Sequence, residues 1–255
     1  MRSPSPLLAL RQARQQLLET GQCPAGIVDE RLARSWHRSM AAGLAPTARV
    51  SPEHASTHHL RHVLASNHAL LAHSRPVMEY VFDQVRQSQS VVVLADSAGM
   101  LMHTLGDPHF VDKAERVALT SGASWNESHR GTNAIGTALV LGGPVRVRGS
   151  EHYLERNRQL SCTAGAIVSP QGTLLGVVDV SGLPRKLGDA QQQQLQAAVR
   201  HIEQRLFDEQ AGALFELRFA PDAATLTTPR CGRLGFDDDG VLRAANRAAL
   251  SALGL

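Results

Sequence analysis

The sequence predicts an α+β fold in which an antiparallel sheet is flanked by helices. Three observations lead to this fold class. Two pairs of β-rich runs are each joined by a short turn-forming segment, which is typical of hairpins. Segments with apolar residues at helical spacing lie before, between and after these pairs. The strands adjoin in hairpins rather than alternating with helices, which disfavours a doubly wound parallel sheet.

The part of the chain before the sheet is predicted to be helical. One helix is expected over residues 7–20 and a second over residues 30–39. A third begins at Ser51, a favourable N-cap, with Pro52 at the first helical position. Pro76 is expected to interrupt this third helix, because proline disrupts helix interiors.

The predicted sheet consists of two hairpins and one further strand with an exposed face. The strands are expected at residues 90–95, 100–105, 145–147, 163–168 and 173–180. Two helices lie between them, at residues 113–120 and 131–141. The second of these helices is expected to be capped by Thr132 or Asn133 and to stop at Gly142.

A long polar helix is predicted over residues 191–210. Its apolar stripe, formed by Leu195, Val199, Ile202 and Leu206, suits a partner helix in a second subunit, the sheet of its own domain, or both. Residues 213–230 are expected to be a connector. A hairpin then follows, and after it a helix over residues 244–253.

Composition restricts the classes of protein to be considered. The net charge is +3, but the arginines are scattered, and only 4% of residues are aromatic, which disfavours a nucleic-acid groove. Three widely spaced cysteines indicate a reduced, cytoplasmic protein. No apolar run is long enough for a membrane span. No phosphate-binding Gly-x-x-x-x-Gly-Lys-[Ser/Thr] motif occurs, so nucleotide hydrolysis is not expected.

Several motifs in order resemble one known family. Trp125-x-Glu127 is followed by Gly131-Thr-Asn-Ala-Ile-Gly-Thr-Ala-Leu139, and a Ser35-Trp-x-Arg38 helix precedes them. With Glu151-His152, Ser161-Cys162 and 175–182, this set is similar to the GAF sensory region of sigma-54-dependent activators of the acetoin-catabolism and dihydroxyacetone regulator type. The C-terminal hairpin and helix resemble the start of a PAS domain.

The resemblance implies a six-stranded antiparallel sheet with an effector pocket over one face, in a cytoplasmic homodimer without enzymatic activity or a cofactor. It also implies that DNA and the sigma-54 RNA polymerase are contacted only through output domains absent from this chain. The expected organisation is an N-terminal helical segment (1–88), the GAF core (89–187), a signalling helix (188–212), a connector (213–230) and a PAS-like start (231–255).

Candidate effector-binding residues lie first in the motif itself. Trp125 could stack on a ligand or anchor its loop in the core. Glu127 could bind a ligand hydroxyl or an arginine, or its charge could simply favour the adjacent helix N-terminus. Asn133 could contact a ligand or act as an ordinary N-cap. Asn126 stands where relatives often carry a small hydroxyl residue, and it is a further candidate.

The remaining candidates are His152, Cys162 and Asp179. His152 follows the strand at 145–147 in the family's order. Cys162 could be an inert buried thiol or the redox centre of a GAF-fold enzyme, which is the alternative function. Asp179 interrupts an apolar strand and needs a partner if it faces the core, either within the protein or on a ligand.

Two further readings complete the sequence-based hypotheses. The histidines at positions 54, 58 and 62 recur at helical spacing, but no cysteine or carboxylate matches them, so no metal site is predicted. A ligand-free dimerisation module is the third candidate function. The leading hypothesis remains a regulatory region that senses a small-molecule effector.

Overall fold

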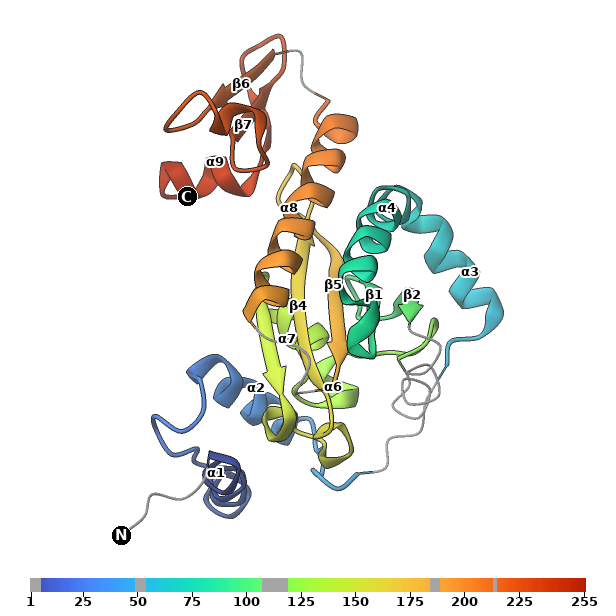
Figure 1. The fold of residues 1–255 in the computed structure, drawn as a ribbon, viewed down its shortest axis with the longest axis vertical. Helices are drawn as coiled ribbons and strands as arrows, with labels where there is room; N and C mark the ends of the chain where they lie inside the picture. Colours follow the sequence, from blue (N-terminus) through green and yellow to red (C-terminus); the bar gives the residue numbers. More distant parts are fainter. Residues whose placement is uncertain (1–5, 49–53, 107–118, 184–188, 213–214) are drawn as a thin grey trace.

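The computed structural model describes residues 6–48, 54–106, 119–183, 189–212 and 215–255 (Figure 1). Its centre is an antiparallel sheet in the order β2-β1-β5-β4-β3. The strands are β1 (Ser90–Asp96), β2 (Leu101–Gly106), β3 (Val145–Arg148), β4 (Ser161–Val168) and β5 (Leu174–Gly182). The α+β class and both predicted hairpins are confirmed.

The described residues give this sheet five strands, so the expected count of six is not confirmed. Among the described residues that follow β2, Ala123 and Ser124 form isolated β-bridges, with His54 and Met100 respectively. These single bridges do not amount to a further strand. The helix predicted at residues 113–120 lies almost entirely outside the described residues.

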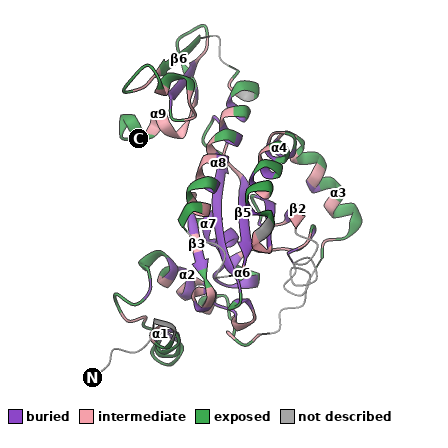
Figure 2. Ribbon diagram, in the orientation of Figure 1, coloured by how far each residue is buried: buried purple, intermediate pink, exposed green. Residues whose placement is uncertain are grey.

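Helices cover both faces of the sheet (Figure 1). One face packs against α4 (His68–Val85) and α8 (Asp189–Gln210), which also contact each other. The other face packs against α7 (Ala134–Leu141), with α6 (Glu127–Arg130) beside it. Each face has its own apolar core, and the three inner strands β1, β5 and β4 are almost entirely buried (Figure 2).

The N-terminal helices α1 (Pro6–Thr20) and α2 (Glu30–Ala41) confirm the first two predicted helices. Helix α2 begins at an N-cap, Asp29, whose carboxylate accepts from the backbone N–H of Arg31. Its buried face includes Trp36, whose indole Nε1 donates to the carbonyl of Glu151 at 2.7 Å. This bond ties the N-terminal helices to the segment that follows β3.

The third predicted helix differs from the structure at both its start and its break. Ser51 and Pro52 lie outside the described residues, and α3 (Thr57–Ser66) begins after the N-cap Ser56. The chain breaks at Asn67, whereas Pro76 lies inside a continuous α4. Burial of one face of α4 against the sheet offsets the hydrogen bond that proline cannot donate.

The surroundings of α8 show which surface its apolar stripe packs against. Leu195, Val199, Ile202 and Leu206 are all buried within this chain, in the core shared with α4 and the sheet. The stripe is therefore not a surface for a second subunit. Its hydrophobic surface is already removed from water in one copy.

The C-terminal residues form a small separate sheet in the order β6-β7-β8. Its elements are β6 (Phe215–Phe219), β7 (Gly232–Phe236), β8 (Leu242–Ala245) and α9 (Arg247–Leu253). The hairpin and helix are confirmed, although the helix begins after its N-cap Asn246 rather than at Ala244. Residues 213–230 are not simply a connector, because β6 pairs with β7. The PAS-like character of this unit stays a prediction.

Short 3-10 helices complete the structure. They are η1 (Arg86–Ser88), η2 (Gly149–Glu151), η3 (Glu155–Asn157) and η4 (Thr225–Thr227). Two of them lie in the segment between β3 and β4. That segment closes on itself where the N–H of Gly149 donates to the carbonyl of Leu160 at 2.8 Å.

Candidate functional site

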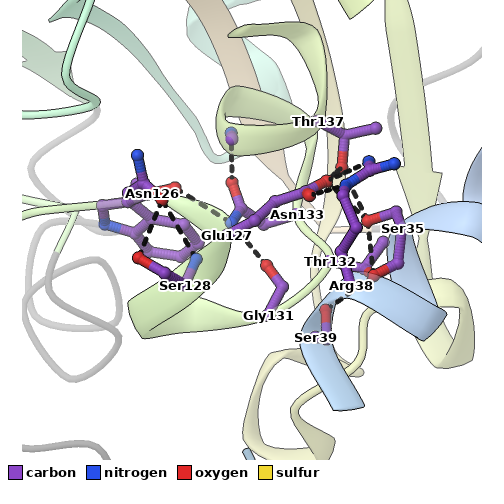
Figure 3. Close-up of polar contacts among 12 residues, drawn as sticks. Ser35, Arg38, Ser39, Asn126, Glu127, Ser128, Gly131, Thr132, Asn133 and Thr137 are labelled. Carbon is purple, nitrogen blue, oxygen red and sulfur yellow. Dashed lines mark hydrogen bonds and ion pairs between the residues drawn. The ribbon is translucent and has the colours of Figure 1, made fainter. Parts of the chain in front are cut away.

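The Trp125–Leu139 motif forms two consecutive helix N-termini, α6 and α7. Asn126 caps α6 by accepting from the backbone N–H of Ser128 at 3.0 Å. Asn133 caps α7 by accepting from the N–H of Gly136 at 2.8 Å. The side-chain amide of Asn133 also donates to the carbonyls of Trp125 and Gly131, at 3.0 and 2.8 Å (Figure 3). Asn133 therefore joins the loop to both helices.

Glu127 is the centre of a buried polar network. Its Oε1 accepts from the hydroxyls of Ser35 and Thr137 at 2.5 and 2.6 Å. The Arg38 guanidinium donates to Oε2 at 2.7 Å and to Oε1 at 3.0 Å. The Glu127 side chain is only 6% exposed, so these bonds compensate the cost of burying its charge. Figure 3 shows Ser35 and Arg38 reaching Glu127 from α2.

This network explains two of the resemblance motifs together. Ser35 and Arg38 come from the Ser-Trp-x-Arg helix, and Glu127 comes from the Trp-x-Glu motif. Thr132, whose Oγ1 lies 2.6 Å from Ser35 Oγ, extends the network into the α7 loop. An arginine was one partner expected for Glu127, but nothing in the sequence singles out Arg38, or Thr132 and Thr137, as members of one network. Ser35 and Arg38 are too far from Glu127 along the chain for a local pattern to indicate their contact.

Trp125 is a core residue, 1% exposed, with the Arg130 guanidinium 5.8 Å from its ring centroid. Its carbonyl and the N–H of Glu127 would each lie 2.8 Å from a Cβ placed on Gly136. Glycine is thus needed at that position for the loop and α7 to approach each other. The side chains of Trp125, Asn126, Glu127 and Asn133 all serve local packing or capping, and their role toward an effector stays a prediction.

A second set of predicted residues lies on the sheet face beneath α7. Cys162 on β4 is paired with Ser181 on β5, and Asp179 is paired with Ala164 and Val93. Directly opposed residues of antiparallel strands share a face, so Cys162, Ser181 and Asp179 project into the α7-side core. Ser181 Oγ lies 2.6 Å from Asp179 Oδ2 and 3.0 Å from Cys162 Sγ.

Asp179 has unsatisfied hydrogen-bonding capacity. The residue is completely buried, and its Oδ1 has no hydrogen-bond partner among the described residues. Burial raises the pKa of Asp179 to about 7, although the Ser181 hydroxyl partly opposes that change. Burial, followed by the nearby charge of Asp179, raises the pKa of the Cys162 thiol well above its usual value. Cys162 is consequently kept as a thiol.

His152 is also completely buried, in the segment between β3 and β4. Its Nδ1 hydrogen-bonds the carbonyl of Gly149 at 3.1 Å, whereas Nε2 has no partner within the described structure. Burial lowers the pKa of His152 to about 4, so its ring is neutral at physiological pH. No hydrogen bond joins His152 to Asp179 within the described residues.

The neighbouring backbone of His152 is fixed by α1. Arg14 donates through Nη1 to the carbonyls of His152 and Tyr153, both at 3.2 Å, and its Nη2 pairs with Glu155. The N-terminal helices therefore contact both candidate regions: α2 holds Glu127, and α1 holds the His152 segment.

The histidine-rich helix does not form a metal site in the described residues, where no cluster of three His, Cys, Asp or Glu side chains could hold an ion. His54 precedes α3 rather than continuing its face. His58 and His62 are exposed on α3. None of the helices in the described ranges is long and apolar enough to cross a membrane.

Comparison with known proteins places this architecture in a family. Residues 6–199 match the family described as MimR, N-terminal domain. The chain is 33% identical over 161 residues to the acetoin dehydrogenase operon transcriptional activator AcoR of Bacillus subtilis, covering 61% of this chain and 27% of that protein. It is 30% identical over 173 residues to the propane 2-monooxygenase operon transcriptional activator MimR of Mycolicibacterium smegmatis, covering 67% and 28%.

A solved structure supports the fold. The E. coli DhaR(N) chain of the DhaR(N)–DhaL complex superposes with a TM-score of 0.67 over 89% of this chain and 78% of that one, at 16% identity. The sequence spans only about a quarter of the named activators, as the shares of 27% and 28% show. Those relatives are transcriptional activators rather than enzymes. The chain belongs to the MimR N-terminal domain family, the regulatory N-terminal region of transcriptional activators.

Proposed function

We propose that this chain is the sensory input region of a bacterial transcriptional activator and that it responds to a small-molecule effector. The observation that carries the proposal is a pair of completely buried polar atoms, Asp179 Oδ1 and His152 Nε2, that lack partners among the described residues. Leaving a buried polar atom unpaired costs about 1–3 kcal/mol. An effector that hydrogen-bonds these atoms would recover that energy.

The proposed effector site lies on the α7 side of the sheet, against His152, Cys162 and Asp179. A hydroxyl or carbonyl group on the effector suits this site, because Asp179 and neutral His152 can each donate or accept. Trp125, Asn126, Glu127 and Asn133 would contribute by fixing α6 and α7 as the wall of the site. Effector binding would then favour one arrangement of that wall over another.

The signal is proposed to pass through the helices of a homodimer to DNA-binding and sigma-54-contacting regions that this sequence does not contain. Because the apolar stripe of α8 is buried within the chain, the dimer would use other surfaces. The named relatives, as activators of operons, support this route only at the level of the whole protein.

A thermal-shift screen against small diols, ketones, phenols and cyclic nucleotides tests the proposal. A ligand at 100 times its dissociation constant should add about 2.7 kcal/mol to the unfolding free energy. Asp179→Asn and His152→Gln should weaken binding of the hit by about tenfold or more, the loss of one good hydrogen bond. Asp239→Asn, at an exposed position, is the matched control and should bind as the parent does.

Two results would contradict the effector proposal. One is the absence of any stabilising ligand, which favours a ligand-free dimerisation module. The other is a ligand that binds the Asp179→Asn and His152→Gln variants with the same affinity as the parent. The redox alternative is tested separately by assaying thiol-dependent redox activity in the parent and in a variant with Cys23, Cys162 and Cys231 all replaced: only the redox alternative expects an activity in the parent that this variant loses. The buried, protonated Cys162 thiol disfavours such an activity.

A protein effector is the second candidate, favoured by the solved complex of DhaR(N) with DhaL. Size-exclusion chromatography of this chain mixed with purified E. coli DhaL would test it. Co-elution would favour recognition of a protein ligand, and separate elution would leave the small-molecule proposal as the better supported one.

A further inference from the structure

A pocket of about 520 Å³ lies between α8, strand β4 of the main sheet and the C-terminal unit formed by β6 to α9. In Figure 1 this unit lies beside the end of α8. The volume is within the range of small-molecule sites. None of the site residues predicted from the sequence lines this pocket, so it is distinct from the proposed effector site.

The C-terminal unit is held to the domain around this pocket by Arg247, at the start of α9. Its Nε donates to Glu203 of α8 at 2.7 Å. Its Nη1 and Nη2 donate to the carbonyls of Gly142 and Ala166, each at 2.9 Å. Arg247 and Glu203 therefore neutralise each other and form a fixed side of the pocket.

The other charges that line the pocket are all positive. Arg200, Arg230 and Arg233 join Arg247 there, against the single carboxylate of Glu203. Arg200 and Arg230 make no ion pair or side-chain hydrogen bond in the described parts of the chain. Burial lowers the pKa of Arg200, and the neighbouring charge of Arg230 lowers it further. Two guanidinium groups that make no ion pair among the described residues thus line the same pocket and repel each other, although the Glu203 carboxylate partly offsets this for Arg200.

Arg233 provides a second, independent observation. Its side chain is 5% exposed, lies 4.2 Å from the ring centroid of Phe207, and pairs through Nε and Nη2 with Glu216 and Asp208 at 2.6 and 2.7 Å. Its Nη1 is buried and has no hydrogen-bond partner among the described residues. A buried donor of a pocket-lining arginine is therefore available to an acceptor.

We propose that this pocket binds a small organic anion, a carboxylate with an apolar body, between α8 and the C-terminal unit. Arg200 and Arg230 supply the charge that recognises the carboxylate, and guanidinium groups suit that geometry. The apolar body fits the walls formed by Ala166, Val199 and Ala248. The Arg233 Nη1 donor serves a polar substituent on the ligand.

Binding would link α8 to α9, because the pocket has walls on both. A ligand that contacts both walls stabilises their docked arrangement over any separated one. This site would therefore set how firmly the C-terminal unit is attached to the end of α8, independently of events at Asp179.

The test is calorimetric titration of the 255-residue chain with benzoate and hexanoate, up to about 10 mM, where even a weak site would fill. Benzamide is the neutral match of benzoate, and inorganic phosphate is an anion without an apolar body. We expect saturable binding of a carboxylate, with benzamide and phosphate at least about tenfold weaker, the scale of one lost charged contact.

Arg200→Gln and Arg230→Gln should each weaken carboxylate binding by about tenfold or more. Removing either charge relieves repulsion, so both variants should fold as the parent does. Arg205→Gln, on the exposed side of the same helix and away from the pocket, should bind unchanged. The proposal is overturned if neither carboxylate binds, if benzamide or phosphate binds as tightly, or if both arginine variants retain the parent affinity.

Discussion

Arg38 and Glu127 form a two-bonded ion pair, at 2.7 and 3.0 Å, that joins helices 89 residues apart in the sequence. The carboxylate is buried and the guanidinium is 37% exposed. The pair fastens α2 to the α6–α7 junction. Helix α2 is thereby attached directly to the loop and helices that cover the main sheet.

Removing the Glu127 carboxylate should be strongly destabilising. Glu127→Ala leaves Ser35, Thr137 and Arg38 without their shared acceptor, and breaking a buried ion pair costs about 3–5 kcal/mol. Urea unfolding measures this change. Glu30→Ala, which removes an exposed ion pair with Arg34 on the same α2 helix, should cost under about 1 kcal/mol. Equal effects of the two substitutions would contradict the central role of Glu127.

Loss of the α7 cap should also be measurable. Asn133→Ala removes one cap bond and two amide bonds within a buried loop, so the loss should exceed the ~1 kcal/mol of an ordinary N-cap. Asn246→Ala, at the N-cap of α9, is the comparison at a less buried site. Thermal unfolding followed by circular dichroism would rank them, with Asn133→Ala expected to be the less stable.

A methyl group on Gly136 should be poorly tolerated. The added Cβ would lie 2.8 Å from backbone atoms of both Trp125 and Glu127, which can shift only if α7 moves. We expect Gly136→Ala to lower stability by about 1–3 kcal/mol, as overpacked sites do. Gly143→Ala meets no atom closer than 3.8 Å and should be nearly neutral. Comparable unfolding midpoints for the two variants would show that the close approach of α7 to Trp125 and Glu127 does not require glycine at position 136.

Stability should decrease as the pH rises through neutrality. The folded pKa of Asp179, about 7, lies above its ordinary value of 3.8, so the native state binds the extra proton and loses that advantage as the pH rises between these values. His152 acts in the opposite sense: its folded pKa of about 4 lies below 6.5, so its stabilising contribution is lost as the pH falls between them.

These opposing effects overlap, because a histidine in the unfolded chain, with its ordinary pKa of 6.5, is still half protonated at pH 6.5. The contribution of Asp179 is therefore the difference between the parent and Asp179→Asn. From about pH 6.5 to 8, the unfolding free energy of the parent should decline relative to that of Asp179→Asn, and His152→Gln should decline at least as steeply as the parent. A constant difference between the parent and Asp179→Asn would contradict the high pKa of Asp179.

Local sequence signals predicted the regular elements well. Both sheet hairpins, the stop of α7 at Gly142 and one of the two caps offered for it, Asn133, are present in the structure. The predicted break at Pro76 was wrong because the effect of a proline depends on what the helix packs against. The local sequence does not contain that information. Strand β6 was missed because it forms through pairing with β7, which lies 13 or more residues further along the chain, and its Phe215 and Leu217 are exposed rather than part of a core.

The candidate site was harder to read, because its determinants are long-range. Glu127 was a candidate from the sequence, yet its partners Ser35 and Arg38 are brought to it only by the packing of α2 beside α6. The polar atoms of His152 and Asp179 lack partners because both side chains are completely buried. That burial comes from elements far apart in the sequence. The pocket beside α8 could not be predicted, because part of its lining comes from the C-terminal unit. The sequence indicated that unit only as the start of a domain and did not indicate where it packs.

The strand order has a consequence for synthesis on the ribosome. The central strand β5 is the last of the main sheet to be made, and it separates the β1–β2 hairpin from the β3–β4 pair. Until residue 182 has been made, neither half has its neighbour, and their inner edges are open to pairing with other chains. Nascent chains that pause before β5 are therefore the form of this protein most exposed to aggregation.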